Sequence, residues 1–217
     1  MAWTNVDNLS KNVPLPEGYR YERLTRADIA NVVRSLAEWY PGIAVGNASC
    51  HLDESFYTDK VVLDGELERD FFVILFKKEA ELVGVLSVER DRDSEVLYGR
   101  VGAVSAKHRG LNLSERFPAL IETMGHAMGM GMVYGLATLK VPHMQTKFER
   151  LGWQLIGIIP GFDREMVEPG VVKRVYEAIY TKVLVRDEDL MRPRYADMTS
   201  KTTELFELLY PGKASPA

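Results

Sequence analysis

Cysteine is almost absent from this chain of 217 residues, which contains Cys50 alone. A single cysteine excludes an internal disulfide and a cysteine-based metal site. Long apolar runs are also lacking, because charged residues or glycines interrupt each apolar stretch well before it reaches the length of a bilayer span. Residues 1–12 lack the basic segment followed by an apolar run that marks a secretory signal. The sequence therefore predicts a soluble cytoplasmic protein with no membrane partner.

The chain also has no excess of positive charge, since its net charge is -4 and its isoelectric point is near 5.7. A nucleic-acid surface needs a concentrated basic face, so we expect no nucleic-acid partner. The chain is 46% hydrophobic and 27% charged, which permits one well-buried core. We expect a single domain over residues 1–217, with a core from about 19 to 185 and a C-terminal extension over 186–217.

Hydrophobic periodicity predicts strands and helices after a lead-in over residues 1–18, where two prolines and a glycine favour extended chain. The strands are expected at 19–24, 71–76, 82–88, 96–104, 133–141, 153–159 and 175–185. The helices are expected at 25–40, 114–128, 143–151 and 202–209. Thr25 and Asp28 resemble a capping box at the start of the first helix. A loop containing Pro160 and Gly161 should join the last two strands.

One segment combines a strand, a polar turn and a long amphipathic helix in a way that favours phosphate binding. The first N–H groups of a helix lack internal partners and carry partial positive charge. In the turn before this helix, Gly110 allows close approach of the backbone, and Asn112 is the non-glycine residue that best tolerates a left-handed conformation. Positive charge nearby comes from Lys107, His108 and Arg109. The turn therefore predicts a site for phosphate groups.

The sequence contains neither G-x-G-x-x-G after a strand nor G-x-x-x-x-G-K-[ST], which excludes the common dinucleotide and nucleoside-triphosphate loops. Instead, Val104-Ser105-Ala106-Lys107-His108-Arg109-Gly110-Leu111-Asn112-Leu113-Ser114 resembles the pyrophosphate loop, [Q/R]-x-x-G-x-[G/A], of the GNAT superfamily of acyl-CoA-dependent N-acyltransferases. The resemblance continues through the long helix and the strand at 133–141. It ends with Phe148-Glu149-Arg150-Leu151-Gly152-Trp153, which is similar to the family's Y-x-x-x-G-[F/Y].

The resemblance implies the GNAT fold, an α/β fold of the α+β type. Its mixed, mostly antiparallel sheet would have six to seven strands, with a parallel splayed pair at the centre and helices on both faces. The splayed pair would be 96–104 and 133–141. Acetyl-CoA or another acyl-CoA would be the co-substrate, and no metal would take part. The cofactor-binding residues implied are Gly102, Ala103, Val104, Lys107, His108, Arg109, Gly110, Leu111, Asn112, Leu113, Ser114 and Phe148.

The reaction implied by the resemblance is direct attack of a primary amine, on a small molecule or a peptide, on the thioester. A backbone N–H group in 102–104 would polarise the thioester carbonyl. Phe148 stands where the family usually has a tyrosine that protonates the departing thiolate, and Tyr98 stands where a carboxylate often serves as base. The catalytic candidates are therefore Tyr98, Glu89 and Glu95.

The amine acceptor is expected between the first helix with its following loop and the loop joining the last two strands. The candidates on the first side are Glu38, Trp39 and Tyr40, and those on the second are Phe162, Asp163, Arg164 and Glu165. Acidic residues beside aromatic residues suit a cationic amine, although packing in the core is an alternative role for Trp39 and Tyr40.

Two other functions stay open at this point, a GNAT-like sensor that binds acyl-CoA without catalysis and an acyltransferase that uses acyl carrier protein. Cys50 precedes His51, but adjacent residues rarely form a nucleophile and base pair, so we expect an incidental cysteine. The four histidines show no metal-ligand spacing. We expect a homodimer, which is common in this fold.

Overall fold

The structure is a computed structural model that describes residues 2–63 and 68–214. The chain divides into two compact units, Met1–Leu184 and Val185–Ala217. The first unit carries the sheet and helices α1 to α5. The second contains α6 (Ser200–Leu209) and two short 3-10 turns, and none of the residues in these three elements is buried.

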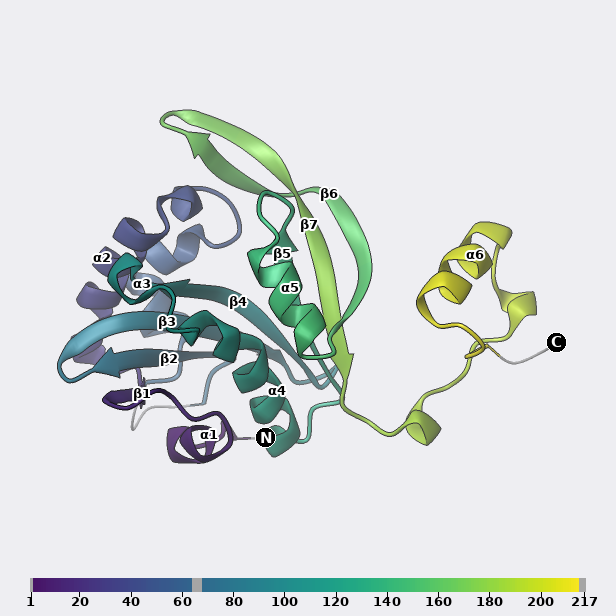
Figure 1. Ribbon diagram of the computed structural model, residues 1–217, viewed down its shortest axis with the longest axis horizontal. Coiled ribbons are helices and arrows are strands. Elements are labelled where there is room, and N and C mark those ends of the chain that lie inside the picture. The colour runs from purple at the N-terminus through teal and green to yellow at the C-terminus, as the bar shows by residue number, and fades with distance from the viewer. Residues whose placement is uncertain (1, 64–67, 215–217) are drawn as a thin grey trace. The chain divides into compact units, whose positions relative to one another are not determined.

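The sheet has seven strands in the described part of the chain (Figure 1). They are β1 (Tyr19–Arg23), β2 (Phe71–Lys78), β3 (Glu81–Asp91), β4 (Val96–Val104), β5 (Met132–Thr138), β6 (Gln154–Glu168) and β7 (Val171–Val183). Their order across the sheet is β1-β2-β3-β4-β5-β7-β6. The pair β4–β5 is parallel, and the other neighbouring pairs are antiparallel. This mixed sheet with one central parallel pair confirms the predicted fold class.

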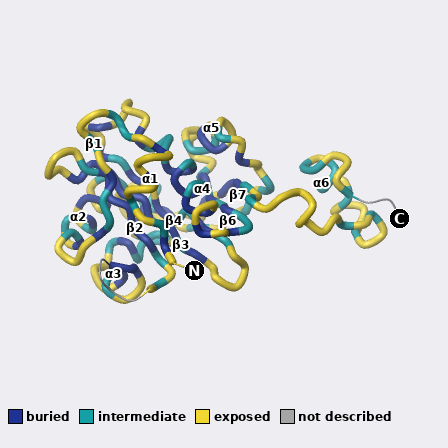
Figure 2. The backbone as a smooth tube through the Cα atoms, turned by 90° about the horizontal axis from the view of Figure 1, so that it is seen from below, coloured by how far each residue is buried: buried dark blue, intermediate teal, exposed yellow. Residues whose placement is uncertain are grey.

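Helices cover both faces of the sheet, and each face has its own hydrophobic core. The helices are α1 (Val6–Asn12), α2 (Ile29–Trp39), α3 (Glu54–Lys60), α4 (Arg116–Met128) and α5 (His143–Arg150). Leu9, Phe117 and Phe148 bring α1, α4 and α5 into one core, whereas Val32 and Tyr57 bring α2 and α3 into the other. The central strands between the two helical layers are the most buried part of the chain (Figure 2).

The start of α2 follows the sequence pattern. The Asp28 carboxylate accepts hydrogen bonds from the Thr25 N–H at 3.1 Å and from the Thr25 hydroxyl at 2.6 Å. A short 3-10 turn, Arg26–Asp28, leads into the helix. The predicted capping box is therefore confirmed. α2 then runs to Trp39, beside the loop that borders the site.

The expectation of an extended lead-in over residues 1–18 is wrong for residues 6–12, which form α1. The side chain of Asn5 accepts a hydrogen bond from the Asp7 N–H at 2.9 Å and so caps the helix. Leu9 is fully buried in the core beneath α4. Tertiary burial of one leucine, together with a local cap, therefore stabilises a helix too short to show a periodic pattern.

The expectation of a loop around Pro160 and Gly161 is also wrong, because β6 continues through them to Glu168. The register between β6 and β7 shifts between Ile159 and Asp163, so Pro160 and Gly161 lie in an irregular part of the ladder. Strand order places β6 at the edge of the sheet. A bulge on an edge strand tolerates proline, since its missing N–H is not needed there.

Candidate active site

The parallel strands β4 and β5 pair over only part of their length. Val96–Gly99 pair with Met132–Gly135, and beyond these residues the described chain shows no pairing between the two strands. Each strand keeps its partner on the other side, β3 for β4 and β7 for β5. The strands therefore separate, and the backbone groups on their facing edges are available to an extended ligand that binds as an added strand.

β4 has a bulge where the two strands separate. On β3, Ser87 pairs with Val101 and Val88 pairs with Gly99, which leaves Arg100 as the extra residue. A bulge bends its strand and changes the direction of its backbone groups. It lies at the first position where β4 has lost β5 as a neighbour.

Two glycines bring α4 against this part of β4. A Cβ atom on Gly102 would lie 2.5 Å from Cδ2 of Phe117, and one on Gly99 would lie 2.6 Å from Cδ1 of Ile121. Both contacts are too short for a larger residue unless the Phe117 ring or the end of the Ile121 side chain shifts. The helix therefore lies directly beside the open strand edge, and its N-terminus follows the predicted phosphate loop.

The loop itself has the conformation that the sequence predicts. Asn112 is left-handed with φ 57°, and Gly110 has φ 88°. Within the part of the chain that the structure describes, the backbone N–H groups of Gly110, Leu111 and Asn112 donate no hydrogen bond. Three unpaired amides ahead of a helix form a site suited to phosphate oxygens.

Lys147 on α5 adds a buried positive charge at this loop. Lys147 is 5% exposed, its ammonium group donates to the Ser114 hydroxyl, and it lies 2.6 Å from Nε2 of His143. The described residues place no carboxylate within ion-pair distance of it. Burial lowers the pKa of Lys147, with an opposing effect of Glu115. A buried ammonium group without an anionic partner, beside free amides, fits an anionic ligand.

Two adjoining pockets lie along the separated strands. The outer pocket has a volume of about 800 Å³ and is lined by residues of β3 to β7 together with Gly46, Asn47 and Ser94. The inner pocket has a volume of about 160 Å³ and reaches Gly102 on β4, Ala137 on β5 and Phe148 on α5. The residues lining both are Asn47, Tyr98, Arg100, Phe162, Asp163 and Arg164. A continuous path therefore leads from the outer pocket to the open strand edges.

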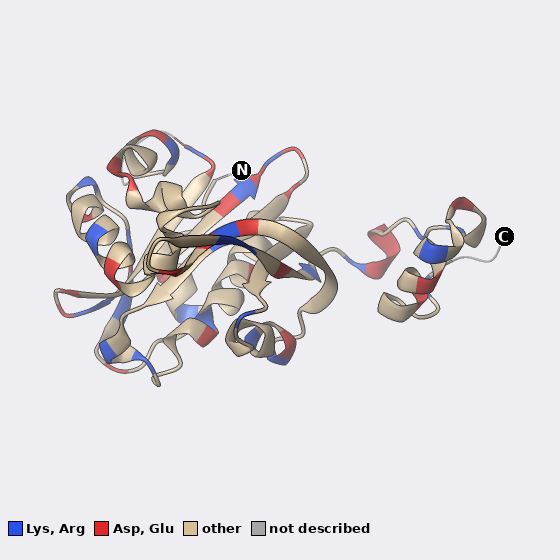
Figure 3. Ribbon diagram, turned by 90° about the horizontal axis from the view of Figure 1, so that it is seen from above, with Lys and Arg blue, Asp and Glu red and all other residues tan. Residues whose placement is uncertain are grey.

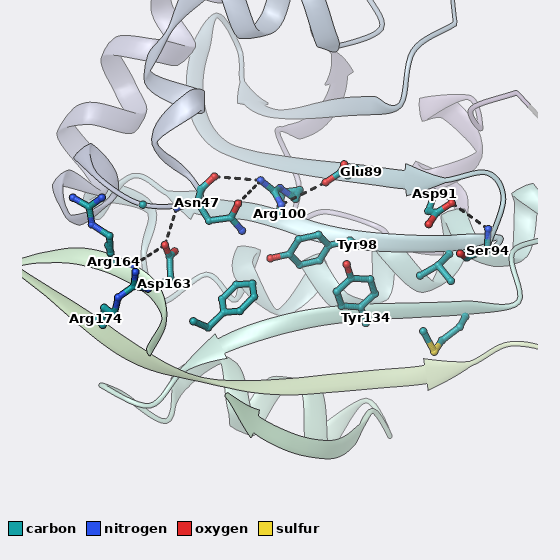
Figure 4. Close-up of a pocket in the computed structure, with 14 residues that line it drawn as sticks. Asn47, Glu89, Asp91, Ser94, Tyr98, Arg100, Tyr134, Asp163, Arg164 and Arg174 are labelled. Carbon is teal, nitrogen blue, oxygen red and sulfur yellow. Dashed lines mark hydrogen bonds and ion pairs between the residues drawn. The ribbon is translucent and has the colours of Figure 1, made fainter. Parts of the chain in front are cut away.

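Arg100 connects two of the elements that line these pockets through hydrogen bonds and an ion pair (Figure 4). Its Nη2 donates to Asn47 at the side-chain oxygen (2.9 Å) and the carbonyl oxygen (3.2 Å), and its Nη1 lies 3.5 Å from Oε2 of Glu89. The Asn47 N–H in turn donates to the Asp163 carboxylate at 2.7 Å. The loop after α2, the bulge of β4 and the strand β6 are therefore joined at one point.

Two stacked tyrosines form one wall of the outer pocket. Tyr98 and Tyr134 are directly opposite in the register of β4 and β5, and their rings lie 4.4 Å apart at an angle of 3°. Burial raises the pKa of both hydroxyls, so both stay protonated at neutral pH. The electron-rich rings suit a cation, and the Arg100 guanidinium already lies over the Tyr98 ring, 5.0 Å from its centroid. The hydroxyl groups are poor bases.

The inner pocket has an acidic wall. Glu165 on β6 is 4% exposed and bonds to the ammonium group of Lys140. Glu177 on β7 is 7% exposed, and among the described residues it has no hydrogen bond or ion pair. Burial, and then the charges of Glu165 and Asp163, raise the pKa of Glu177 to about 7, against the effect of Lys140. The wall therefore holds a carboxyl group that is part ionised near neutral pH and has no protein partner.

The predicted catalytic residues lie in different places. Tyr98 lines both pockets, and Glu89 lines the outer pocket, where it faces Arg100. Glu95 is exposed in the turn before β4, with φ 52°, and lines neither pocket. The structure thus brings Tyr98 and Glu89 to the site and leaves Glu95 away from it.

The predicted acceptor residues also divide. Tyr40 lines the inner pocket, and Phe162 and Asp163 line both pockets. Trp39 packs against the core formed with α2 and α3, whereas Glu38 is exposed on α2 and lines neither pocket. The end of α2 and the strand β6 therefore border the pockets, through fewer residues than the sequence predicts.

Among the predicted cofactor residues, His108 is turned to the protein. Its Nδ1 lies 2.8 Å from the Tyr19 hydroxyl and its Nε2 lies 3.5 Å from Oε1 of Glu81. It therefore ties the loop to β1 and β3. Lys107 and Arg109 are exposed, with their side chains open to solvent.

Phe148 is buried at 3% exposure and stacks on Tyr180 with ring centroids 5.1 Å apart. It also fills the space beside Gly135, where a Cβ atom would lie 2.6 Å from its ring. The Tyr180 hydroxyl donates to Glu149 at 2.8 Å. Phe148 therefore shapes the inner pocket but brings no proton donor to it.

The pair Cys50–His51 lines neither pocket. His51 is fully buried, with Nε2 2.9 Å from the Ser87 hydroxyl and Nδ1 3.1 Å from the Ala48 carbonyl oxygen. Burial lowers the pKa of His51 to about 4 and raises the pKa of the Cys50 thiol. Both shifts oppose an activated thiolate, so this pair has a structural role.

Sequence reasoning missed Glu177 and Lys147. Glu177 lies two residues from both Val175 and Ile179 on β7, and side chains two residues apart on a strand point to the same face. Its carboxylate therefore shares a face with two apolar residues. A carboxylate on the apolar side of a strand was the available signal. Lys147 gave no such signal, because its burial depends on how α5 packs beside the loop.

Residues 2–63 and 68–214 include no cluster of side chains able to hold a metal ion and no helix long and apolar enough to cross a membrane. In the unit Met1–Leu184, Lys and Arg are interspersed with Asp and Glu along the ribbon (Figure 3). The charge that bears on the site is therefore local, at the loop on one side and the acidic wall on the other.

No family model and no curated protein sequence matches this chain. Solved structures do. Spermidine N-acetyltransferase from Vibrio cholerae, a dodecamer, matches with a TM-score of 0.60 at 10% identity, over 77% of this chain and 95% of its own. The ribosomal-protein-S18-alanine N-acetyltransferase from Escherichia coli matches with 0.60 at 9% identity, over 80% and 99%. Arabidopsis thaliana NAA60 in complex with acetyl-CoA matches with 0.59 at 10% identity, over 76% and 98%.

Proposed function

We propose that this chain, which has the GNAT fold, is an N-acyltransferase that moves an acetyl or other acyl group from coenzyme A to a primary amine. The acceptor is a small molecule or a peptide, and attack on the thioester is direct. One observation carries the proposal. The open edges of β4 and β5 join a loop with three free amides on one side to an acidic pocket on the other.

The two sides of the strand opening suit the two substrates. Phosphates of coenzyme A fit the amides of 110–112 and the ammonium group of Lys147. The pantetheine arm fits the edge of β4 as an added strand, which brings the thioester to the bulge at Arg100. A backbone N–H group at the bulge then stabilises the oxyanion as it forms. The amine approaches from the outer pocket.

The structural neighbours support the type of chemistry. They are N-acetyltransferases whose names give acceptors as different as spermidine and a ribosomal protein, and one of them is in complex with acetyl-CoA. We extend this to acetyl-CoA as the co-substrate of a soluble cytoplasmic enzyme that acts as a homo-oligomer.

A sensor that binds acyl-CoA without transfer is the second candidate, and Phe148 favours it. The residue is buried and has no hydroxyl to protonate the departing thiolate. A thiol with a reference pKa of about 8.5 can leave as the thiolate, so this loss lowers the rate without preventing the reaction. Transfer therefore remains the first candidate.

Thermal unfolding with coenzyme A, and release of free thiol from acetyl-CoA with polyamines, amino acids, aminoglycosides and peptides, test the proposal. Gly110→Asp should abolish stabilisation by coenzyme A, since it adds a negative charge to the loop. Gly170→Asp is the matched control, because Gly170 has φ 76° and equally open surroundings in the β6–β7 turn. If coenzyme A raises the unfolding temperature but no acceptor causes release of thiol from acetyl-CoA, the sensor is favoured. No stabilisation, in wild type or control, contradicts coenzyme A binding.

A further inference from the structure

Glu177 differs from the other acidic residues of the pockets in having no protein partner. Glu165 bonds to Lys140, Glu89 faces Arg100, and Asp163 accepts from the Asn47 N–H. Glu177 is 7% exposed, lies on the wall of the inner pocket, and makes no hydrogen bond or ion pair within the described chain. A buried carboxyl group normally has a partner. The oxygens of Glu177 are not among the fully enclosed atoms without a partner, so they open into the inner pocket, where a ligand can supply the partner.

The position of Glu177 relative to the open strand edges identifies that partner. Glu177 is directly opposite Thr138 in the register of β7 and β5. Thr138, Ala137 and Gly102 line the same pocket from the two separated strands. A group bound to Glu177 from within the pocket therefore lies beside the edge where the thioester fits.

The charged and titratable groups around Glu177 favour a cation. Three of them shift the pKa of Glu177: Glu165 and Asp163 on β6, and Lys140 in the turn after β5. Glu177 in turn shifts the pKa of Tyr40, after α2, and of Tyr98 on β4. Three carboxyl groups, counting Glu177, face one lysine. Arg100 and Arg164 also line the pocket, but Arg100 is paired with Glu89 and Asn47, and neither arginine is among the charges that shift the pKa of Glu177. Both tyrosines stay neutral because burial raises their pKa. A cationic amine enters such a pocket with favourable electrostatics.

We infer that the acceptor is a cationic amine and that Glu177 accepts the proton which the amine must lose before it attacks. This rests on the proposed acyltransferase function and names its substrate class and its base. None of Tyr98, Glu89 and Glu95 has this combination of burial, missing partner and place beside the strand edge.

The step balances in atoms and charge. The ammonium group gives one proton to the Glu177 carboxylate, and the freed lone pair attacks the thioester carbon. The C–N bond forms, the C–S bond breaks and sulfur leaves as the thiolate. The nitrogen loses a second proton as the amide forms, and that proton neutralises the thiolate. Glu177 returns its own proton to solvent through the outer pocket.

The protonation behaviour of Glu177 fits this role. A pKa of about 7 makes the carboxylate a stronger base than an ordinary carboxylate, while about half of it remains ionised at neutral pH. A bound ammonium group would lower that pKa, so the value near 7 belongs to the protein before the amine binds.

The test is the pH dependence of kcat/KM for acetyl transfer to a polyamine, measured for wild type and Glu177→Gln. We expect the variant to lose about 10²- to 10⁴-fold in kcat/KM and to lose the ionisation near pH 7. Glu177→Asp should keep that ionisation with an intermediate rate. Glu168→Gln, at the exposed end of β6, is the control and should match wild type. Stabilisation by coenzyme A should be unchanged in all three variants.

The outcomes separate this inference from the proposed function. If wild type transfers acetyl groups and Glu177→Gln keeps the same rate and pH profile, Glu177 is not the base and the inference fails alone. A loss of rate with the ionisation near pH 7 retained also overturns it. Preferred transfer to uncharged amines contradicts the substrate class. Wild type that releases no thiol with any acceptor overturns both the function and the inference.

Discussion

Glu177 and Lys147 are buried ionisable residues without an ion-pair partner in the described chain, one on each side of the strand opening. Burial of a charge without a counterion lowers the stability of a protein. Residues that act on a ligand can be retained despite this effect, because the ligand supplies the missing partner. For both residues we therefore expect that removing the charge impairs function without lowering the stability of the protein.

Glu177→Gln should be more stable relative to wild type at pH 8 than at pH 5, so that its free energy of unfolding exceeds that of wild type by more at pH 8. The folded-state pKa of about 7 lies above the ordinary glutamate value of 4.5, so ionisation of Glu177 destabilises the folded protein. This effect sets in as the pH rises from about 4.5 to 7 and is complete above 7. Urea unfolding at the two pH values measures it. A constant difference between variant and wild type contradicts the assigned pKa.

For Lys147→Met, we expect about tenfold weaker binding of coenzyme A and no loss of stability in its absence. The variant removes a cation from the phosphate site and leaves an apolar stem of similar length. Calorimetric titration with coenzyme A measures the change, and acetyl-pantetheine, which lacks the nucleotide phosphates, is the control ligand. Equal losses for both ligands show that Lys147 acts through packing.

At the scale of elements, the contact between β4 and α4 controls the shape of the site. The helix packs directly on two strand glycines, and its N-terminus carries the phosphate loop. The bulge of β4 lies between these glycines. Movement of the helix therefore changes the strand edge and the loop together.

Gly102→Ala should destabilise the protein by about 1–3 kcal/mol and weaken coenzyme A binding, because its methyl group would overlap the Phe117 ring. Gly157→Ala on β6 is the matched control, since no atom lies within 4 Å of a Cβ there and its effect should stay within about 0.5 kcal/mol. Thermal unfolding with and without coenzyme A measures both. Wild-type stability of Gly102→Ala contradicts the direct contact.

At the scale of the whole molecule, the hydrophobic core belongs to the unit Met1–Leu184. The two core clusters contain no residue beyond Leu184 in the described chain. The unit Val185–Ala217 has α6, which leaves Leu205 52% and Leu208 78% exposed. Each unit is compact by itself, and the site described above lies within the first.

A chain that ends at Leu184 should fold, bind coenzyme A and unfold cooperatively within a few degrees of the full-length protein, because no residue of the core clusters is removed. Circular dichroism and thermal unfolding measure this. Light scattering on both chains tests the proposed homo-oligomer, which should persist in the shorter chain if its contacts lie on the first unit. Failure of the shorter chain to fold contradicts the independence of the core.

The sequence alone determined the central elements of the fold, because periodic hydrophobic residues and local turn chemistry act over short distances. The boundaries of β4, the capping box at Thr25 and the left-handed Asn112 all follow from neighbouring residues. The same local chemistry predicted the phosphate loop. It did not identify α1 or the continuation of β6, which depend on burial and on a partner strand.

Only the tertiary structure decided the acidic side of the site. Glu177 lies far along the chain from Gly102 and Thr138, and strand order and register bring the three to one pocket. Whether a carboxylate on a strand is paired, buried or exposed depends on residues that are distant in sequence, as the different surroundings of Glu95 and Glu177 show. Charges interact through space, so the proton acceptor that we propose could be identified only from strand order and register.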